Sequence, residues 1–163
     1  MNAQQLHDLI IKPALRYMGG NYDSKDARFL LLCTAAIESK CGYYIKQIKG
    51  PALGAWQMEP ETHDDIWGNC DALRKGDIPI CVNSLRLSTA VSPHDNLVAS
   101  PMYACAMARL KYSMDSASLP KHDNFREVYN YYKRIYNTPA GASTYEKFKQ
   151  ACIECNIFEV DLG

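Results

Sequence analysis

The sequence lacks long apolar runs, an excess of one charge, and any strong bias toward glycine or proline. No apolar run approaches the roughly 20 residues that a bilayer-spanning helix needs. Eighteen basic residues balance eighteen acidic ones, so the charge does not indicate binding to nucleic acid or to an anionic membrane. With 9 Gly and 8 Pro in 163 residues, the chain is neither collagen-like nor of low complexity. We expect a globular protein without nucleic-acid partners or a membrane span.

The N-terminal segment also lacks the features of a secretory signal peptide. Residues 1–20 have no basic residue before their short apolar stretch and no convincing cleavage site. We therefore expect synthesis in the cytoplasm without a Sec signal. The chain has seven cysteines, an odd number, and we expect mostly reduced thiols rather than a disulfide framework. A loop disulfide between Cys70 and Cys81 is the alternative in an oxidising compartment.

Length and apolar spacing predict one mainly α-helical domain over residues 1–163. Residues 43–60 are rich in Gly, Pro and aromatics and predict a small hairpin or loop lobe, while residues 63–95 predict short helices and ordered loops. No run of alternating residues indicates a β-sheet. The predicted helices cover Leu6 to Met18 with a bend at Pro13, Asp23 or Ser24 to Gly42, residues 96–114, about 123–136 and about 144–156.

Glu38 is the acidic residue best suited to acid–base chemistry. It continues the apolar helix face of Leu31, Thr34 and Ala35, so its side chain should point toward the interior. It also lies in the last helical turn, where the helix dipole disfavours negative charge. Both effects raise a carboxyl pKa toward the range of a general acid near neutral pH. Alternatively, Glu38 lies at the rim of this face, where it reaches solvent or pairs with Lys40 or a more distant basic residue.

A second informative segment is residues 54–62, GAWQMEPET. Its glycine permits close approach of backbone or ligand, and the amide of Gln57 can donate and accept hydrogen bonds. Met58 and Trp56 could form an apolar wall suited to the face of a sugar. The alternative is a tight turn before a helix that begins at Pro60, with Trp56 in the core.

Four short motifs follow one another along the chain: Glu38-Ser39, residues 54–62, Asn96-Leu97 at the start of a helix, and Tyr136-Asn137 within YNTPAG. Their order and spacing resemble the soluble lytic transglycosylases of the lysozyme superfamily. In that family a Glu-Ser pair ends a buried helix, and a Gly-x-x-Gln-x-x-Pro-x-Thr segment follows about twenty residues later. The YNTPAG variant is similar to phage-encoded, lysozyme-like virion and lysis proteins. The resemblance covers roughly residues 28–145 and leaves residues 63–95 without a counterpart.

The resemblance implies roles for individual side chains. Glu38 matches the sole catalytic acid/base of the family, and Ser39 matches a residue that helps to orient substrate. The loop that lines the glycan groove corresponds to Gln57 and Met58, and Tyr136 corresponds to a tyrosine near the catalytic glutamate. Tyr132 shares a helix face with Tyr136. The expected substrate-binding residues are therefore Ser39, Gln57, Met58, Tyr132, Tyr136 and Asn137.

The function that the resemblance implies is cleavage of peptidoglycan at the MurNAc-β-1,4-GlcNAc bond by a lysozyme-like domain, without metal or cofactor. Protonated Glu38 would donate to the glycosidic oxygen, and the substrate's own C6 hydroxyl would attack to give 1,6-anhydro-MurNAc, as in substrate-assisted glycosidases. Such a bacteriolytic enzyme, a phage endolysin or virion-associated protein, acts in the cell wall or periplasm as a monomer or on the virion. If water attacks instead, the protein is a muramidase that needs a second carboxylate, for which Glu59, Glu61, Asp64 and Asp65 are candidates.

Other classes of function have weaker support. Cys152 and Cys155 form a single C-x2-C pair, and the four histidines are scattered along the sequence, so no zinc site is expected. A Cys-His peptidase needs a cysteine that opens a helix, whereas Cys33 lies in mid-helix. A binding protein with a lysozyme-like shell is the non-enzymatic alternative, and it is favoured if Glu38 is ion-paired or the groove is filled.

Overall fold

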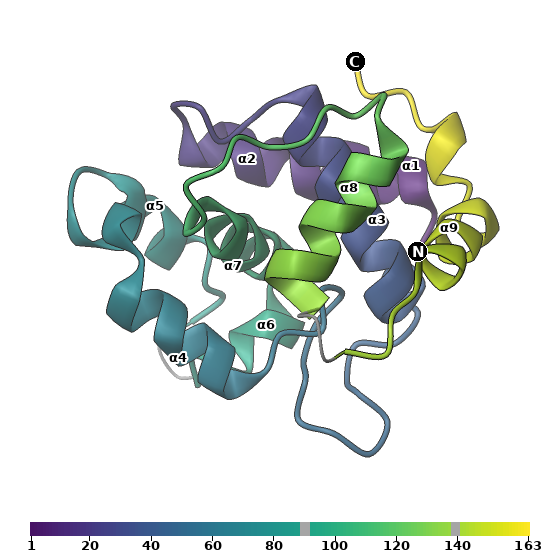
Figure 1. Cartoon of the computed structure of the whole chain (residues 1–163). Helices are drawn as coiled ribbons and strands as arrows, with labels where there is room; N and C mark the ends of the chain where they lie inside the picture. Colours follow the sequence, from purple (N-terminus) through teal and green to yellow (C-terminus); the bar gives the residue numbers. More distant parts are fainter. Residues whose placement is uncertain (89–91, 138–140) are drawn as a thin grey trace.

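The structure is a computed structural model that describes residues 1–88, 92–137 and 141–163. These residues form mainly α-helices (Figure 1), which confirms the predicted fold class. None of the described helices is both long and apolar enough to cross a membrane. The α-helices are α1 (Ala3–Leu6), α2 (Lys12–Met18), α3 (Lys25–Ser39), α4 (Pro60–Asn69), α5 (Ile78–Ser84), α6 (Asn96–Ala99), α7 (Pro101–Ser113), α8 (Phe125–Tyr132) and α9 (Tyr145–Glu154). Single π-helical turns, η1 (His7–Ile11) and η3 (Lys133–Asn137), and 3-10 turns, η2 (Asp71–Arg74) and η4 (Ile157–Glu159), connect or extend them.

Helix α3 lies at the centre of the helical body and contacts α7, α8 and α9 (Figure 1). The hydroxyl of Ser24 caps its first turn by accepting a hydrogen bond from the Ala27 amide at 3.0 Å. Every residue from Ala27 to Ala36 is buried, because a helix that is apolar around most of its circumference is stable only inside the fold. The helix ends at Ser39, earlier than the predicted stop at Gly42, since Lys40 already has a left-handed backbone with φ 51°.

Two predicted helices are divided into shorter elements near a proline. The predicted helix over residues 96–114 divides into α6 and α7 because Pro101 has no amide hydrogen to continue the ladder, and the hydroxyl of Ser100 caps the new helix. The predicted helix from Leu6 to Met18 contains the wider π-helical turn η1, which ends at Ile11, and α2 begins at Lys12 with Pro13 in its first turn. Asn96 opens α6 as predicted, and α4, η2 and α5 confirm short helices between residues 63 and 95.

Residues 40–59 connect α3 to α4 as an ordered loop that projects from the helical body (Figure 1). Isolated antiparallel bridges pair Leu53 with Lys46 and with Met58, and they confirm the predicted hairpin or loop lobe near residues 43–60. The amide of Gly54 also donates to the carbonyl of Ile45 at 2.8 Å. This backbone pairing gives the loop a defined path, although no strand forms in it.

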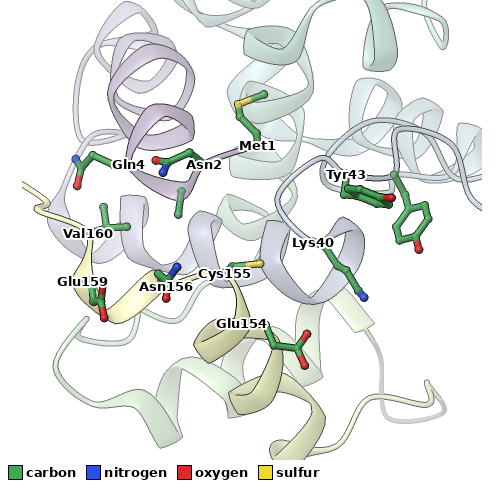
Figure 2. Close-up of a pocket in the computed structure, with 12 residues that line it drawn as sticks. Met1, Asn2, Gln4, Lys40, Tyr43, Glu154, Cys155, Asn156, Glu159 and Val160 are labelled. Atoms are coloured by element: carbon green, nitrogen blue, oxygen red, sulfur yellow. The ribbon is translucent and has the colours of Figure 1, made fainter.

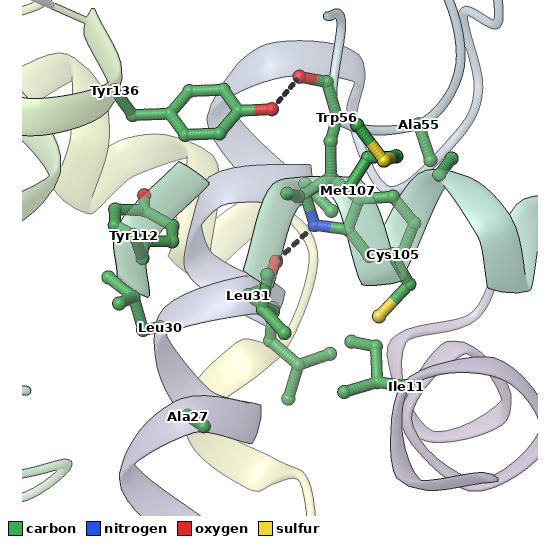
Figure 3. Close-up of a cluster of buried hydrophobic side chains, with 14 of the residues drawn as sticks. Ile11, Ala27, Leu30, Leu31, Ala55, Trp56, Cys105, Met107, Tyr112 and Tyr136 are labelled. Atoms are coloured by element: carbon green, nitrogen blue, oxygen red, sulfur yellow. Dashed lines mark hydrogen bonds between the residues drawn. The ribbon is translucent and has the colours of Figure 1, made fainter. Parts of the chain in front are cut away.

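Trp56 anchors this loop to the core. Its side chain is 1% exposed, and its indole N–H donates to the carbonyl of Leu31 at 3.0 Å (Figure 3). The carbonyl of Trp56 in turn accepts a hydrogen bond from the Tyr136 hydroxyl at 2.7 Å. Trp56 is therefore a core residue and not part of a sugar-binding wall.

Candidate functional site

A pocket of about 380 Å³ opens where α3, the loop of residues 40–59, α4, α7 and η3 meet. Five of the seven residues singled out from the sequence line it, although they come from three distant parts of the chain. Ser39 and Tyr132 do not reach its lining. The lining residues are Glu38, Gln47, Ala52, Gln57, Met58, Glu59, Thr62, Lys111, Tyr136 and Asn137.

The Glu38 carboxyl group is half-buried in the last turn of α3. Its Oε1 accepts a hydrogen bond from the Tyr132 hydroxyl at 2.7 Å. Across the described residues no ion pair involves Glu38, and the expected alternative partner, Lys40, is exposed. Burial raises the pKa of Glu38, and this effect exceeds the opposing effects of the Tyr132 hydrogen bond and the Lys111 charge. Glu38 therefore has the environment of a general acid.

Lys111 supplies a positive charge that the sequence analysis did not identify. Its Nζ donates to the carbonyl of Tyr136 at 3.3 Å and lies 4.4 Å from the centre of that tyrosine ring. Burial lowers the pKa of Lys111, while the charges of Glu38, Glu59 and Asp65 act in the opposite direction. The only sequence signal for this position was a lysine within the mainly apolar α7, which also carries Arg109.

The two tyrosines predicted to bind sugars have different positions. Tyr136 presents part of its ring to the pocket, and its hydroxyl is held by Trp56. Tyr132 is 1% exposed and lies behind Glu38, to which its hydroxyl is bonded. The rings stack with centroids 6.2 Å apart and an angle of 20° between their planes. Tyr132 thus positions the carboxyl group, and only Tyr136 can face a ligand.

Ser39 lies inside the protein and fixes the end of α3 to the loop. Its Oγ is 2.5 Å from the Ala55 carbonyl oxygen and accepts a hydrogen bond from the Gly42 amide at 2.7 Å. The side chain is 1% exposed. Its contacts fit a role in holding Glu38 in place, and they leave no face of Ser39 free to orient a substrate.

Gln57 and Gly54 form a tight turn at the edge of the pocket. Gln57 has a left-handed backbone with φ 44°, and its side-chain amide donates to the Gly54 carbonyl at 2.8 Å. A Cβ atom at Gly54 would collide with the backbone carbonyl of Leu97, so this position requires glycine. The remaining part of the Gln57 amide can face the pocket beside Met58, which forms its apolar side.

Asn137 reaches the pocket from the end of η3. Its side-chain oxygen accepts a hydrogen bond from Nζ of Lys133 at 2.8 Å, and the same Nζ donates to the Gly141 carbonyl at 2.6 Å. Lys133 therefore links the two ends of the YNTPAG motif. Residues 138–140 of that motif lie outside the described part of the chain.

A larger pocket of about 650 Å³ lies between the N-terminus and the end of α9 (Figure 2). Its carboxylates, Glu154 and Glu159, are exposed, so it offers no buried acid. Cys155 lines this pocket, whereas Cys152 is fully buried. The two cysteines of the C-x2-C pair therefore have different surroundings. All seven cysteines are free thiols.

The histidines are scattered along the sequence, but the fold brings two of them together. The ring centroids of His63 and His94 lie 5.0 Å apart, and Asp64 is hydrogen-bonded to both rings. These three residues are the one group of potential metal ligands found within the described residues. The sequence places His63 and His94 thirty-one positions apart, a separation that carries no signal of proximity.

The hydrogen bond from Tyr132 can be tested through the pKa of Glu38. Tyr132→Phe should raise that pKa further, because the hydroxyl that stabilises the carboxylate is lost. Carboxyl ¹³C NMR over a pH series measures the change. Tyr136→Phe is the matched control, since this hydroxyl donates to the Trp56 carbonyl instead. A lower pKa in Tyr132→Phe, or an equal rise in both variants, contradicts the assignment.

The burial of Glu38 predicts a pH dependence of stability. The folded protein holds the Glu38 proton more tightly than the unfolded chain, whose ordinary pKa is 4.5. Relative to Glu38→Gln, wild type should therefore lose stability as pH rises from 4.5 through the folded-state pKa. Urea unfolding at a series of pH values measures this difference in the free energy of unfolding. If the free energy of unfolding of wild type instead rises with pH relative to that of Glu38→Gln, burial is not the dominant effect on the pKa of Glu38.

Asp115→Asn gives the control of opposite sign for this measurement. The hydrogen bond from Arg134 lowers the pKa of Asp115. Stability contributed by this aspartate is therefore present above its ordinary pKa of 3.8 and is lost as pH falls toward the folded-state value.

Comparisons with known proteins do not identify the chain. No family model matches it, and neither the curated proteins nor the solved structures include a match. What the pocket does must therefore be inferred from its own geometry and chemistry.

Proposed function

We propose that the protein cleaves peptidoglycan glycan strands as a lytic transglycosylase, with Glu38 as the acid/base. The observation that carries the proposal is a half-buried carboxyl group with a raised pKa, free of ion pairs among the described residues, at an open pocket. The polar side chains of Gln57 and Asn137 and the apolar side chain of Met58 surround it. This mixture suits a sugar, which presents hydroxyl groups at its rim and C–H groups on its faces.

The chemistry needs one enzyme carboxyl group. Glu38 gives its proton to the β-1,4 glycosidic oxygen as the bond from that oxygen to C1 of MurNAc breaks. The N-acetyl oxygen of the substrate stabilises C1, and the substrate's C6 oxygen then forms the new bond to C1 while its proton returns to Glu38. The products are 1,6-anhydro-MurNAc and a free GlcNAc hydroxyl, with no water consumed. A single group that alternates between acid and base suffices because the substrate supplies the nucleophile.

Tyr132 and Lys111 support Glu38 in the state that follows proton transfer. The Tyr132 hydroxyl and the Lys111 charge both stabilise the carboxylate, while burial favours the protonated acid. These opposing influences keep the two forms of Glu38 closer in energy than burial alone would. The proposed site of action is the cell wall or periplasm, reached as an endolysin or as part of a virion.

Glu38→Gln tests the proposal directly. The amide keeps the size of the side chain and has no acidic proton, so clearing of purified peptidoglycan should fall by at least about 10²-fold. Turbidity and zymogram assays measure the loss, and circular dichroism checks that the variant is folded. Glu127→Gln, an exposed glutamate on α8, is the matched control and should clear like wild type. Undiminished clearing by Glu38→Gln removes this residue from the mechanism, and no clearing by wild type on several cell-wall types favours the binding protein.

A muramidase is the second candidate, because Glu59 lines the same pocket as Glu38. None of the other sequence candidates, Glu61, Asp64 and Asp65, reaches that lining. If the protein is a hydrolase that uses Glu59 as the base, the wild type should release reducing muropeptides and Glu59→Gln should lose most of this activity. The transglycosylase should keep activity in this variant, and mass spectrometry should find muropeptides lighter by one water.

A further inference from the structure

We propose that His63, Asp64 and His94 form a binding site for a divalent transition-metal cation of the Zn²⁺ class. His63 and Asp64 lie on α4, and His94 lies in the turn before α6. None of them lines the pocket that holds Glu38. The site is therefore separate from the proposed glycan chemistry and does not depend on it.

The ligand atoms already lie close to the spacing that a metal needs. Asp64 Oδ1 is 3.0 Å from His63 Nδ1 and 2.7 Å from His94 Nε2. The ligand atoms of the three residues all lie within 4.8 Å of one another. Tetrahedral Zn²⁺ with bonds of about 2.0–2.2 Å separates its ligand atoms by roughly 3.3 Å. The ion would fit once these two separations lengthen by about 0.3 and 0.6 Å and the two histidine nitrogens, within 4.8 Å of each other, take a similar spacing.

The donor set selects the class of metal. Two imidazole nitrogens and one carboxylate oxygen suit Zn²⁺ and neighbouring transition metals, whereas Ca²⁺ and Mg²⁺ prefer sites built from oxygen. Three protein ligands leave the fourth tetrahedral position to water. Asp64 is exposed and His94 is partly exposed, so a metal ion and its water can reach the site from solvent.

His63 has a hydrogen-bond partner on Nε2, the ring nitrogen that would not bind the metal. His63 is 2% exposed, and its Nε2 lies 2.7 Å from the Tyr103 hydroxyl oxygen. That oxygen also accepts a hydrogen bond from the indole N–H of Trp67 at 2.9 Å. When Nδ1 binds a metal, Nε2 carries the ring proton and can donate it to the Tyr103 oxygen, which then holds the ring of His63 in place. Metal-bound histidines usually have such a partner, which fixes the orientation of the ring.

A metal at this position would connect two segments that the backbone leaves separate. His63 belongs to α4, while His94 belongs to the segment that leads into α6. Both segments pack beside α7, through the ring of Tyr103 and the backbone contacts of α6. A shared ion would therefore stabilise the approach of residues 92–95 to α4. Because the ion would bind the folded chain and not the unfolded one, it would also raise the free energy of unfolding.

The test uses full-length protein freed of metal with a chelator and then titrated with Zn²⁺ in competition with a chromophoric chelator. Wild type should bind one Zn²⁺ per chain at this site. His94→Gln and Asp64→Asn should each weaken binding by at least about 10-fold. The matched control is His122→Gln, which removes a histidine that is also bonded to an aspartate, Asp26, at 2.7 Å. Equal binding by wild type and His94→Gln overturns the proposal.

Two further readouts exclude the cysteines and misfolding as explanations. Co²⁺ at the proposed site should give the visible bands of nitrogen and oxygen ligation without the near-ultraviolet charge-transfer band of a thiolate ligand. Zn²⁺ should raise the melting temperature of wild type and of His122→Gln, and should leave that of His94→Gln unchanged. A thiolate band, or an equal rise in all three proteins, assigns the metal to another site and overturns the proposal.

Discussion

The site depends on a chain of hydrogen bonds that passes through Trp56. Its indole N–H bonds to the Leu31 carbonyl on α3, and its own carbonyl receives the Tyr136 hydroxyl. Both bonds are buried, where an unmade hydrogen bond would cost about 1–3 kcal/mol. Three parts of the chain that are far apart in sequence are thereby held together: the central helix, the loop and η3. The pocket exists because these bonds and the packing around them fix that arrangement.

The second constraint is a balance of charge at Glu38. Burial favours the protonated acid, and Tyr132 and Lys111 favour the carboxylate. An unopposed buried carboxyl group would hold its proton too firmly to act as an acid, and a fully ion-paired one would not hold it at all. The structure combines half-burial with one hydroxyl donor and a nearby cation that forms no ion pair with Glu38. Acid–base chemistry requires this intermediate condition.

Features that depend on neighbours in the chain could be predicted from the sequence, and features that depend on packing between distant segments could not. The Ser24 cap and the apolar face of α3 act through neighbours in the chain, and their consequences were predicted correctly. The close backbone approach expected at Gly54 is also present, but the backbone that approaches it belongs to the distant Leu97. Lys111 and the pair His63 and His94 depend on how α7 and the segment before α6 pack, and the sequence analysis missed them. No periodicity within one segment reports which residues of another segment will face it.

Roles within the site also depended on tertiary packing. The sequence placed Ser39 and Tyr132 beside the expected substrate, yet both are buried and bonded to protein groups. Helical spacing determines which residues share a face, and it cannot say whether that face meets solvent, a pocket or another helix.

The sequence by itself determined a mainly α-helical chain with a glutamate at the end of its most apolar helix and an ordered loop after it, because these features arise from propensity, capping and periodicity over short distances. Only the tertiary structure decided that Glu38 meets Lys111 and Gln57 at one pocket, that Tyr132 donates to Glu38 from behind it, and that two distant histidines share one aspartate. Contacts between distant segments are determined by the packing of the whole core, and no single stretch of sequence encodes them.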